Sequence, residues 1–309
     1  MAEQTTVDLS GTFFPVTTPF DPVTGDVDIV AFRANLRRWF ENPISGVLIA
    51  GSTGESVFLD EAERVLLLEA AADVVPHDKV LIAGTGSEST RHTIHLTRQA
   101  ASAGADAVLV SPPAYFKGAM TPGVLARHFK AVADASPVPV LVYQVPLRMS
   151  TLDLPTGLIE ELSQHPNIVG IKDSRGKLDL VGELVEHSAD DFQVMVGSGA
   201  LLYGALETGA VGGIVAVGLL AAAEAAEVSV AFAEGRMADA GRTQERIAPV
   251  HQQIVGGMGV PGVKAALDVL GLHGGEPRAP LEKASEKKIA EIRTILAAAE
   301  LLTPALTPS

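Results

Sequence analysis

The sequence predicts a (β/α)8 barrel with a C-terminal helical extension. Eight short runs rich in β-branched residues alternate with helix-type patterns, and most of these runs are apolar on both faces, as in a covered parallel sheet. The 309 residues also suit a barrel of about 250 residues plus an extension. An open doubly wound sheet is the alternative, but the first run is followed by TTPFDP at 17–22, without dinucleotide-binding glycines.

The predicted strands share short length, apolar composition and flanking turn residues. They are residues 12–16, 46–49, 79–83, 107–110, 140–143, 169–172, 193–196 and 213–216. The predicted barrel helices between them are residues 28–40, 60–74, 90–103, 121–135, 156–164, 178–187 and 200–207. Asp60 and Glu63 form a capping-box pattern at the start of the second helix, and Gly104 is placed to end the third.

Further helices are predicted after the eighth strand, at 219–233, 238–254, 260–270 and 282–302, with a frayed tail at 303–309. Residues 1–218 are therefore assigned to the barrel. Residues 219–309 are assigned to the last barrel helix and a helical extension of the same domain, because no change in composition separates them.

Composition narrows the classes of partner. The formal net charge of -14 gives no electrostatic footprint for nucleic acid or an anionic membrane. The most apolar segment, 211–226, is interrupted by glycines and Glu224, so no membrane span is expected. The chain has no cysteine, which excludes thiol catalysis and is compatible with the reducing cytoplasm. The N-terminal residues do not resemble a secretion signal, so a cytoplasmic location is expected.

Lys172 is the most informative residue, because it ends an apolar strand at the barrel face where active sites form. Burial disfavours the ammonium form, and a neutral lysine can attack a carbonyl carbon. The competing interpretation is a lysine that reaches solvent from a strand end. Tyr143 ends the preceding strand, where its phenol could transfer protons or could simply be a core tyrosine.

The loop Gly51-Ser52-Thr53-Gly54-Glu55 follows the second strand and offers amides and hydroxyls that suit a carboxylate. It could also be an ordinary turn, and Glu55 is interpreted as a scaffold carboxylate. The tripeptide Gly197-Ser198-Gly199 indicates a tight turn near the substrate.

Ile214, on the eighth strand, is included among the expected substrate contacts. His92 and His95 lie three apart on a helix, but no third ligand is evident, so no metal site is predicted.

These residues occur within motifs that resemble the pyruvate-dependent Schiff-base lyases of the dihydrodipicolinate synthase / N-acetylneuraminate lyase family. The motifs are GSTGES at 51–56, YQVP at 143–146, GIKDS at 170–174 and GVPGVKAAL at 259–267, and the likeness runs from GTFFPVTTPF to PRAPL. The glutamine of YQVP replaces an asparagine that is frequent in the family, and little effect on the chemistry is expected.

The resemblance implies that Lys172 forms an imine with a 2-keto acid, with no metal or organic cofactor. It implies that Tyr143 and Ser52 relay protons and that Thr53, with neighbouring amides such as that of Gly51, binds the substrate carboxylate. Tyr115 matches a second relay tyrosine that the family supplies across a dimer interface, so a homo-oligomer, typically a dimer of dimers, is expected.

Two activities compete within the family. Arg148 occupies the place of an arginine that helps the synthase bind aspartate semialdehyde, although any carboxylate would suit it. LSQHPNIVGIKDS at 162–174, DFQVMVGS at 191–198, ALETGAVGGI at 205–214 and GGEPRAPL at 274–281 resemble 4-hydroxy-2-oxoglutarate aldolases more closely. Ser174 adds a hydroxyl suited to a hydroxylated substrate.

The sequence therefore favours retro-aldol cleavage of a hydroxylated 2-keto acid. The alternatives are the synthase reaction, a 2-keto-3-deoxy sugar acid aldolase or dehydratase, a non-catalytic keto-acid binder, and a metal-dependent aldolase.

Overall fold

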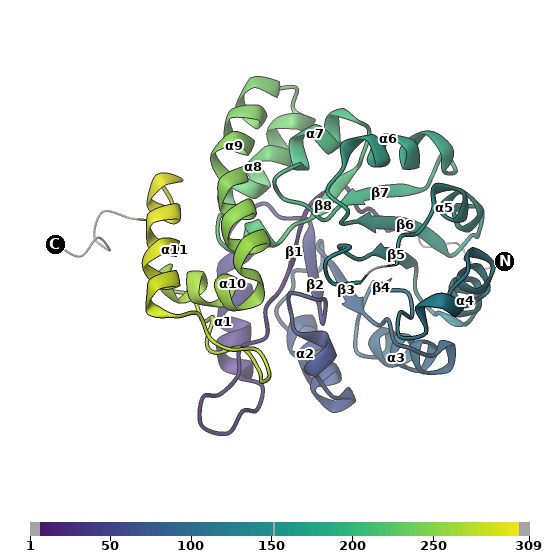
Figure 1. Cartoon of the computed structure of the whole chain (residues 1–309), viewed down its shortest axis with the longest axis horizontal. Coiled ribbons are helices and arrows are strands. Elements are labelled where there is room, and N and C mark those ends of the chain that lie inside the picture. Colours follow the sequence, from purple (N-terminus) through teal and green to yellow (C-terminus); the bar gives the residue numbers. More distant parts are fainter. Residues whose placement is uncertain (1–6, 151, 303–309) are drawn as a thin grey trace.

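A computed structural model describes residues 7–150 and 152–302, so the predicted frayed tail at 303–309 lies outside the described residues. Its centre is a closed parallel barrel in which the strands pair in sequence order and β8 closes onto β1 (Figure 1). The strands are β1 Gly11–Pro15, β2 Gly46–Ile49, β3 Val80–Gly84, β4 Ala107–Val110, β5 Val140–Gln144, β6 Ile168–Asp173, β7 Gln193–Val196 and β8 Gly212–Ile214. The predicted barrel is confirmed.

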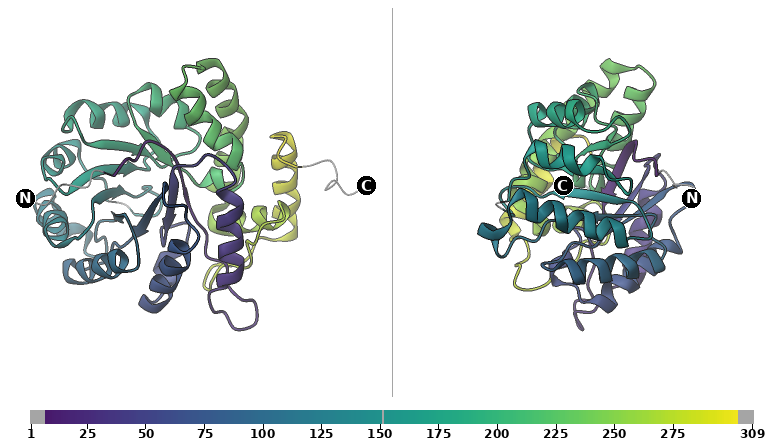
Figure 2. Two further views of the ribbon diagram at one scale, coloured as in Figure 1. Left: turned by 180° about the vertical axis from the view of Figure 1, so that it is seen from behind. Right: turned by 90° about the vertical axis from the view of Figure 1, so that its right-hand side faces the viewer.

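Helices surround the barrel and cover the outer faces of its strands, as Figure 2 shows from two further directions. They are α1 Ile29–Trp39, α2 Glu61–Ala72, α3 Thr90–Ser102, α4 Pro122–Ala135, α5 Thr156–Ser163, α6 Leu178–His187, α7 Leu202–Glu207 and α8 Ala222–Ala233. The extension contains α9 Met237–Val250, α10 Gly257–Val269 and α11 Glu286–Ala298. Among the described residues, no helix combines the length and apolar character needed to cross a bilayer.

Local capping explains several helix ends. The Asp60 carboxylate accepts the Glu63 amide and the Glu63 carboxylate accepts the Asp60 amide, which confirms the capping box of α2. Gly104 follows α3 with a φ of +100°, a conformation that a side chain would strain. The predicted last helix, 282–302, is shorter in the structure because the Ser285 side chain caps α11 at its start.

Two predicted boundaries after the seventh helix are wrong for identifiable reasons. Residues 215 and 216 do not extend β8, because the chain turns into a 3-10 helix, Ala216–Leu219, before α8. Gly218 allows this turn, since a Cβ there would lie 2.0 Å from the Phe14 ring. The predicted helix 238–254 changes at Val250 into a π-helix, His251–Gly256, which borders the mouth of the barrel.

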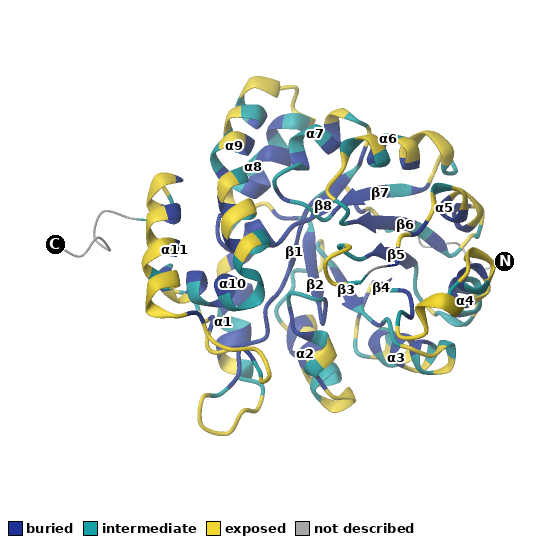
Figure 3. Ribbon diagram, viewed as in Figure 1, coloured by how far each residue is buried: buried dark blue, intermediate teal, exposed yellow. Residues whose placement is uncertain are grey.

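The apolar core forms two layers. Figure 3 shows the buried strands surrounded by partly exposed helices. The larger layer fills the space between the strands and the helices. The smaller one fills the barrel interior, where Phe13, Leu48, Leu141 and Met195 pack with Tyr143. These side chains, Tyr143 included, therefore point inward, toward the barrel axis.

A buried ion pair joins the extension to the loop after β2. Lys264 of α10 and Glu55 are both buried, and the Lys264 Nζ donates to Glu55 Oε1 over 2.7 Å and to the carbonyls of Thr18 and Glu276. Burial lowers the pKa of Lys264, and the charge of Glu55 offsets part of this shift. Glu55 also accepts the Arg278 amide, so the carboxylate holds two segments of the extension. Its predicted scaffold position is confirmed.

We expect Glu55→Gln to lower the free energy of unfolding by about 3–5 kcal/mol, because it leaves the Lys264 ammonium buried without a counter-charge. Urea titration of the full chain measures this change. Lys283→Met serves as the control, because Lys283 pairs with Glu276 at the surface and its loss should leave stability nearly unchanged. An equally small effect of both substitutions would show that the buried pair does not stabilise the extension.

Candidate active site

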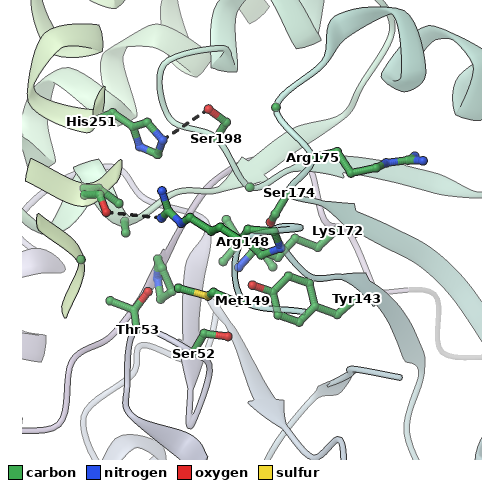
Figure 4. Close-up of a pocket in the computed structure, with 18 of the residues that line it drawn as sticks. Ser52, Thr53, Tyr143, Arg148, Met149, Lys172, Ser174, Arg175, Ser198 and His251 are labelled. Atoms are coloured by element: carbon green, nitrogen blue, oxygen red, sulfur yellow. Dashed lines mark hydrogen bonds between the residues drawn. The ribbon is translucent and has the colours of Figure 1, made fainter. Parts of the chain in front are cut away.

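A cavity of about 360 Å³ opens at the carboxyl ends of the strands, where barrel enzymes place their active sites. Figure 4 shows side chains that line it, from the strand ends, the loop after β2 and the π-helix. Eight of the residues expected from the sequence line this cavity: Ser52, Thr53, Tyr143, Arg148, Lys172, Ser174, Gly197 and Ile214. Gly51 instead borders a neighbouring cavity of about 30 Å³, together with Ser52 and Tyr143.

Lys172 stands near the end of β6, directly opposite Tyr143 of β5 and Met195 of β7. Its side chain is 5% exposed, and the Nζ atom lies 4.7 Å from the centre of the Tyr143 ring. Burial lowers the pKa of Lys172 to about 7. A substantial fraction of the amine is therefore neutral, and nucleophilic, near neutral pH.

Tyr143 is buried beside this amine, and burial raises the pKa of its phenol. Hydrogen bonding to the hydroxyls of Ser52 and Ser174, and the charge of Arg148, act in the opposite direction on that pKa. The phenol is consequently protonated at neutral pH. The Ser52 and Ser174 hydroxyls that act on its pKa are groups with which this phenol can exchange a proton.

The loop that carries Ser52 and Thr53 begins in a strained conformation. Ala50 has a φ of +54°, in the left-handed region that residues with a Cβ seldom adopt. Gly84 permits its approach, because a Cβ at Gly84 would lie 2.2 Å from the Ala50 carbonyl oxygen. The Lys264–Glu55 pair holds the other end of the loop. The two hydroxyls are thus fixed at the cavity wall.

Gly197 provides room for two side chains of the site. A Cβ at this position would lie 1.9 Å from the Ser174 Oγ and 3.1 Å from the Lys172 Cε. Any larger residue would displace one or both of them. The close approach also places the next residue, Ser198, at the same cavity.

Arg148 crosses the mouth of the cavity toward the extension. Its guanidinium donates to the carbonyl of Gly256 over 2.8 Å and to that of Val255 over 3.5 Å, at the end of the π-helix (Figure 4). The helical path is interrupted just beyond these carbonyls, at Gly259 with a φ of +66°, and carbonyls near such a break favour a cation. Arg148 lines the cavity, and its contact with a substrate stays a prediction; the sequence did not indicate these carbonyls.

Comparison with known proteins identifies the relatives of this chain. Residues 8–299 match the model of the dihydrodipicolinate synthetase family. The chain belongs to this family. A probable mitochondrial 4-hydroxy-2-oxoglutarate aldolase from Emericella nidulans is 34% identical, with 92% of each chain covered. A 4-hydroxy-tetrahydrodipicolinate synthase from Methanothrix thermoacetophila is 35% identical, with 93% of this chain and 95% of that protein covered.

Solved structures agree with this assignment. A prophage protein of the dihydrodipicolinic acid synthase family from E. coli K12, determined in complex with pyruvate, superposes with a TM-score of 0.89. It is 26% identical and covers 95% of this chain and 99% of its own. The protein is therefore a class I carbon–carbon lyase of the dihydrodipicolinate synthase type.

Gln144, the departure from the common family motif, fixes the loop that leads to Arg148. Its side-chain amide donates to the carbonyls of Val145 and Leu152, and its oxygen accepts the Leu154 amide. The side chain is buried and does not line the main cavity. The replacement is visible in the sequence, but the loop-closing position of this side chain is not, because it depends on partners eight and ten residues away.

Asp173 and Arg175 form a second feature that the sequence analysis missed. Arg175 donates through its amide and its Nε to the Asp173 carboxylate, and the two side chains are almost fully buried. Burial raises the pKa of Asp173, and Arg175 counteracts this shift. Figure 4 shows the Arg175 side chain directed away from Lys172. The Asp173 carboxylate, although next to Lys172 in sequence, is thus paired with Arg175 and not with the Lys172 amine.

His251 is another residue of the site that the sequence did not indicate. The ring lines the cavity and contacts the loop after β7 through Ser198 and Gly199. It comes from the π-helix, 53 residues from Ser198 in sequence. No local pattern could have connected them, because only the packing of the extension brings the two segments together.

Two sequence expectations concern residues outside the cavity. Tyr115 is 80% exposed, packs edge-to-face on Phe116, and does not meet Tyr143 within this chain. His92 and His95 are half-exposed and each contacts a carboxylate oxygen of Glu61. Glu61 begins the neighbouring helix α2 and is 31 residues from His92 and 34 from His95, so no local pattern indicated it.

We expect the Lys172 amine to react with acetic anhydride near neutral pH, with a rate that rises with pH and is half-maximal at about pH 7. The reason is that burial removes the proton at a lower pH than in water. Peptide mass spectrometry after brief labelling measures the rate for each lysine. Lys283 is the internal control, because Glu276 raises its pKa and its labelling should stay low until strongly alkaline pH. Parallel profiles for the two lysines would contradict the expectation.

Proposed function

We propose that the protein cleaves a hydroxylated 2-keto acid such as 4-hydroxy-2-oxoglutarate by a retro-aldol reaction through an imine on Lys172. The observation that carries the proposal is the buried amine of Lys172, with its lowered pKa, beside the Tyr143 phenol and the Ser52 hydroxyl. The aldolase named among the relatives supports the choice of substrate.

The proposed reaction begins when the neutral Lys172 amine attacks the C2 carbonyl carbon and the carbinolamine loses water. The resulting protonated imine withdraws electrons, so the C4 hydroxyl can lose its proton while the C3–C4 bond breaks. Glyoxylate, whose aldehyde group is the former C4, leaves. The electrons of the C3–C4 bond form an enamine on the remaining three carbons. Protonation of C3 gives the pyruvate imine, and hydrolysis releases pyruvate and restores the amine. No metal or organic cofactor takes part.

Each remaining residue has a proposed task. Tyr143 and Ser52 transfer protons to and from the carbinolamine and the substrate oxygens, since the Ser52 and Ser174 hydroxyls act on the phenol and both line the same cavity. Thr53, with amides of the loop including that of Gly51, binds the C1 carboxylate. Ser174 faces the C4 hydroxyl, and Gly197 and Ile214 shape the wall around the carbon chain.

The synthase reaction with aspartate semialdehyde is the second candidate, because Arg148 lines the cavity and could bind that carboxylate. Synthases of similar identity among the relatives favour the same reaction. A sugar-acid aldolase or dehydratase and a keto-acid binder without turnover are the remaining alternatives, and the substrate assay below distinguishes all of them.

We also propose a homo-oligomer, a dimer of dimers, in which Tyr115 approaches the site of a second copy. The exposed aromatic pair Tyr115 and Phe116 supports this, since large aromatic side chains favour interfaces. The cytoplasmic location expected from the sequence stays a prediction.

Treatment with pyruvate and borohydride should attach a reduced adduct to Lys172, because hydride reduces the imine to a stable amine. Peptide mass spectrometry locates the adduct, and Lys172→Met should abolish it. Lys283→Met is the control, because Lys283 pairs with Glu276 at the surface and its loss should leave the adduct on Lys172 unchanged. An adduct on another lysine would falsify the assignment.

Tyr143→Phe should reduce turnover by about 10²–10⁴-fold while leaving pyruvate adduct formation much less affected, because proton transfer limits the later steps. Turnover is followed with 4-hydroxy-2-oxoglutarate, with aspartate semialdehyde plus pyruvate, and with 2-keto-3-deoxy sugar acids. We expect the first substrate to give the highest kcat/KM, unchanged by EDTA. Faster reaction with another substrate, or sensitivity to EDTA, would reject the proposed activity.

A further inference from the structure

The far wall of the cavity contains a hydroxyl whose direction is set by a histidine. The His251 Nδ1 lies 3.2 Å from the Gly199 amide nitrogen, and its Nε2 lies 3.3 Å from the Ser198 Oγ (Figure 4). A backbone N–H can only donate, so Nδ1 must be the acceptor. The hydrogen of the neutral ring is therefore on Nε2.

This tautomer determines what Ser198 can do. Because Nε2–H donates to the Ser198 oxygen, the hydrogen of the serine hydroxyl is left to point elsewhere. Burial and the nearby charge of Arg148 hold the pKa of His251 at about 4, which keeps the ring neutral at physiological pH. Ser198 is thus left with its hydroxyl hydrogen free to donate to a ligand, while the histidine occupies one of its two lone pairs.

The loop that carries Ser198 is held at both ends. Gly197 packs against Ser174 and Lys172 on one side of it. On the other side, the Gln244 side chain of α9 donates to the Gly199 carbonyl over 2.9 Å and accepts the Tyr203 amide. The donor therefore has little freedom to turn away from the cavity.

Arg148 adds positive charge at the same wall. Two of its guanidinium nitrogens contact the carbonyls of Val255 and Gly256, and a guanidinium has five N–H groups, so donors are left for a ligand. The wall thus combines an oriented hydroxyl donor with a cation, a combination that suits an oxyanion.

We propose that Ser198, oriented by His251, is a specificity-determining donor that binds the carboxylate at the far end of a dicarboxylic 2-keto acid. His251 acts through Ser198 and is a positioning residue. The inference builds on the proposed imine at Lys172, which fixes one end of the substrate. It adds that the other end is selected by charge and by hydrogen-bond donors and not by shape alone.

The test compares two 2-keto acids of equal carbon number, 2-oxoglutarate and 2-oxopentanoate, of which only the first has a distal carboxylate. For each, the concentration that gives half-maximal borohydride-trapped adduct is measured on the full chain. We expect the wild-type protein to prefer 2-oxoglutarate. Ser198→Ala should reduce that preference about tenfold, since one hydrogen bond to a charged group is lost.

The role of His251 is tested with two replacements. His251→Asn keeps an acceptor for the Gly199 amide but withdraws the donor from Ser198, so it should reduce the preference as Ser198→Ala does. His251→Gln places an amide N–H near the position of Nε2 and should retain most of the preference. The double variant Ser198→Ala/His251→Asn should lose no more than either single variant, because the two residues act as one unit.

Ser188→Ala is the matched control, because this serine lies at the end of α6, outside the cavity, and should leave the preference unchanged. The proposal is overturned if wild type does not distinguish the two acids, or if Ser198→Ala distinguishes them as wild type does. A uniform loss of affinity for both acids in the His251 variants would show that the histidine only supports the loop. Absence of a pyruvate adduct in wild type would instead reject the proposed function, so the two failures are separate.

Discussion

Keeping the Lys172 amine out of water, without a counter-charge, is the constraint on which the rest of the site depends. The chain contains a second buried lysine, Lys264, which shows the alternative outcome. Lys264 has the Glu55 carboxylate 2.7 Å away and two carbonyls as acceptors. Lys172 is comparably buried, and burial is the one cause of its lowered pKa, whereas the Glu55 carboxylate opposes the effect of burial on Lys264. The surroundings of Lys264 therefore stabilise an ammonium, and those of Lys172 favour a free amine.

The alternation of side chains along β6 makes this difference possible. Asp173 follows Lys172 directly, and a strand directs successive side chains to opposite faces. The carboxylate therefore points away from the cavity, where Arg175 binds it. A one-residue change of register would turn Asp173 into the barrel and Lys172 to the outer face, so the amine would leave the cavity. The neutral amine thus depends on the strand register as much as on the apolar surroundings.

The barrel and the site could be predicted from sequence to the extent that they depend on local patterns. Apolar strands located Lys172 and Tyr143, and glycine-rich loops located Ser52 and Gly197. The strand boundaries were displaced by one or two residues at several ends, because side-chain periodicity does not report where pairing stops. The π-helix could not be predicted, since Pro249 and the glycines at 256, 257 and 259 offer several ways to end a helix.

Contacts between distant segments were the information that sequence could not supply. His251 reaches Ser198, and Arg148 reaches Gly256, over separations of 53 and 108 residues. These contacts exist because the extension packs across the barrel mouth, where the Lys264–Glu55 pair holds it. The extension therefore does more than cover the barrel. It supplies the histidine that orients a donor and the carbonyls that restrain Arg148, so a change in its packing should alter substrate preference before it alters the amine.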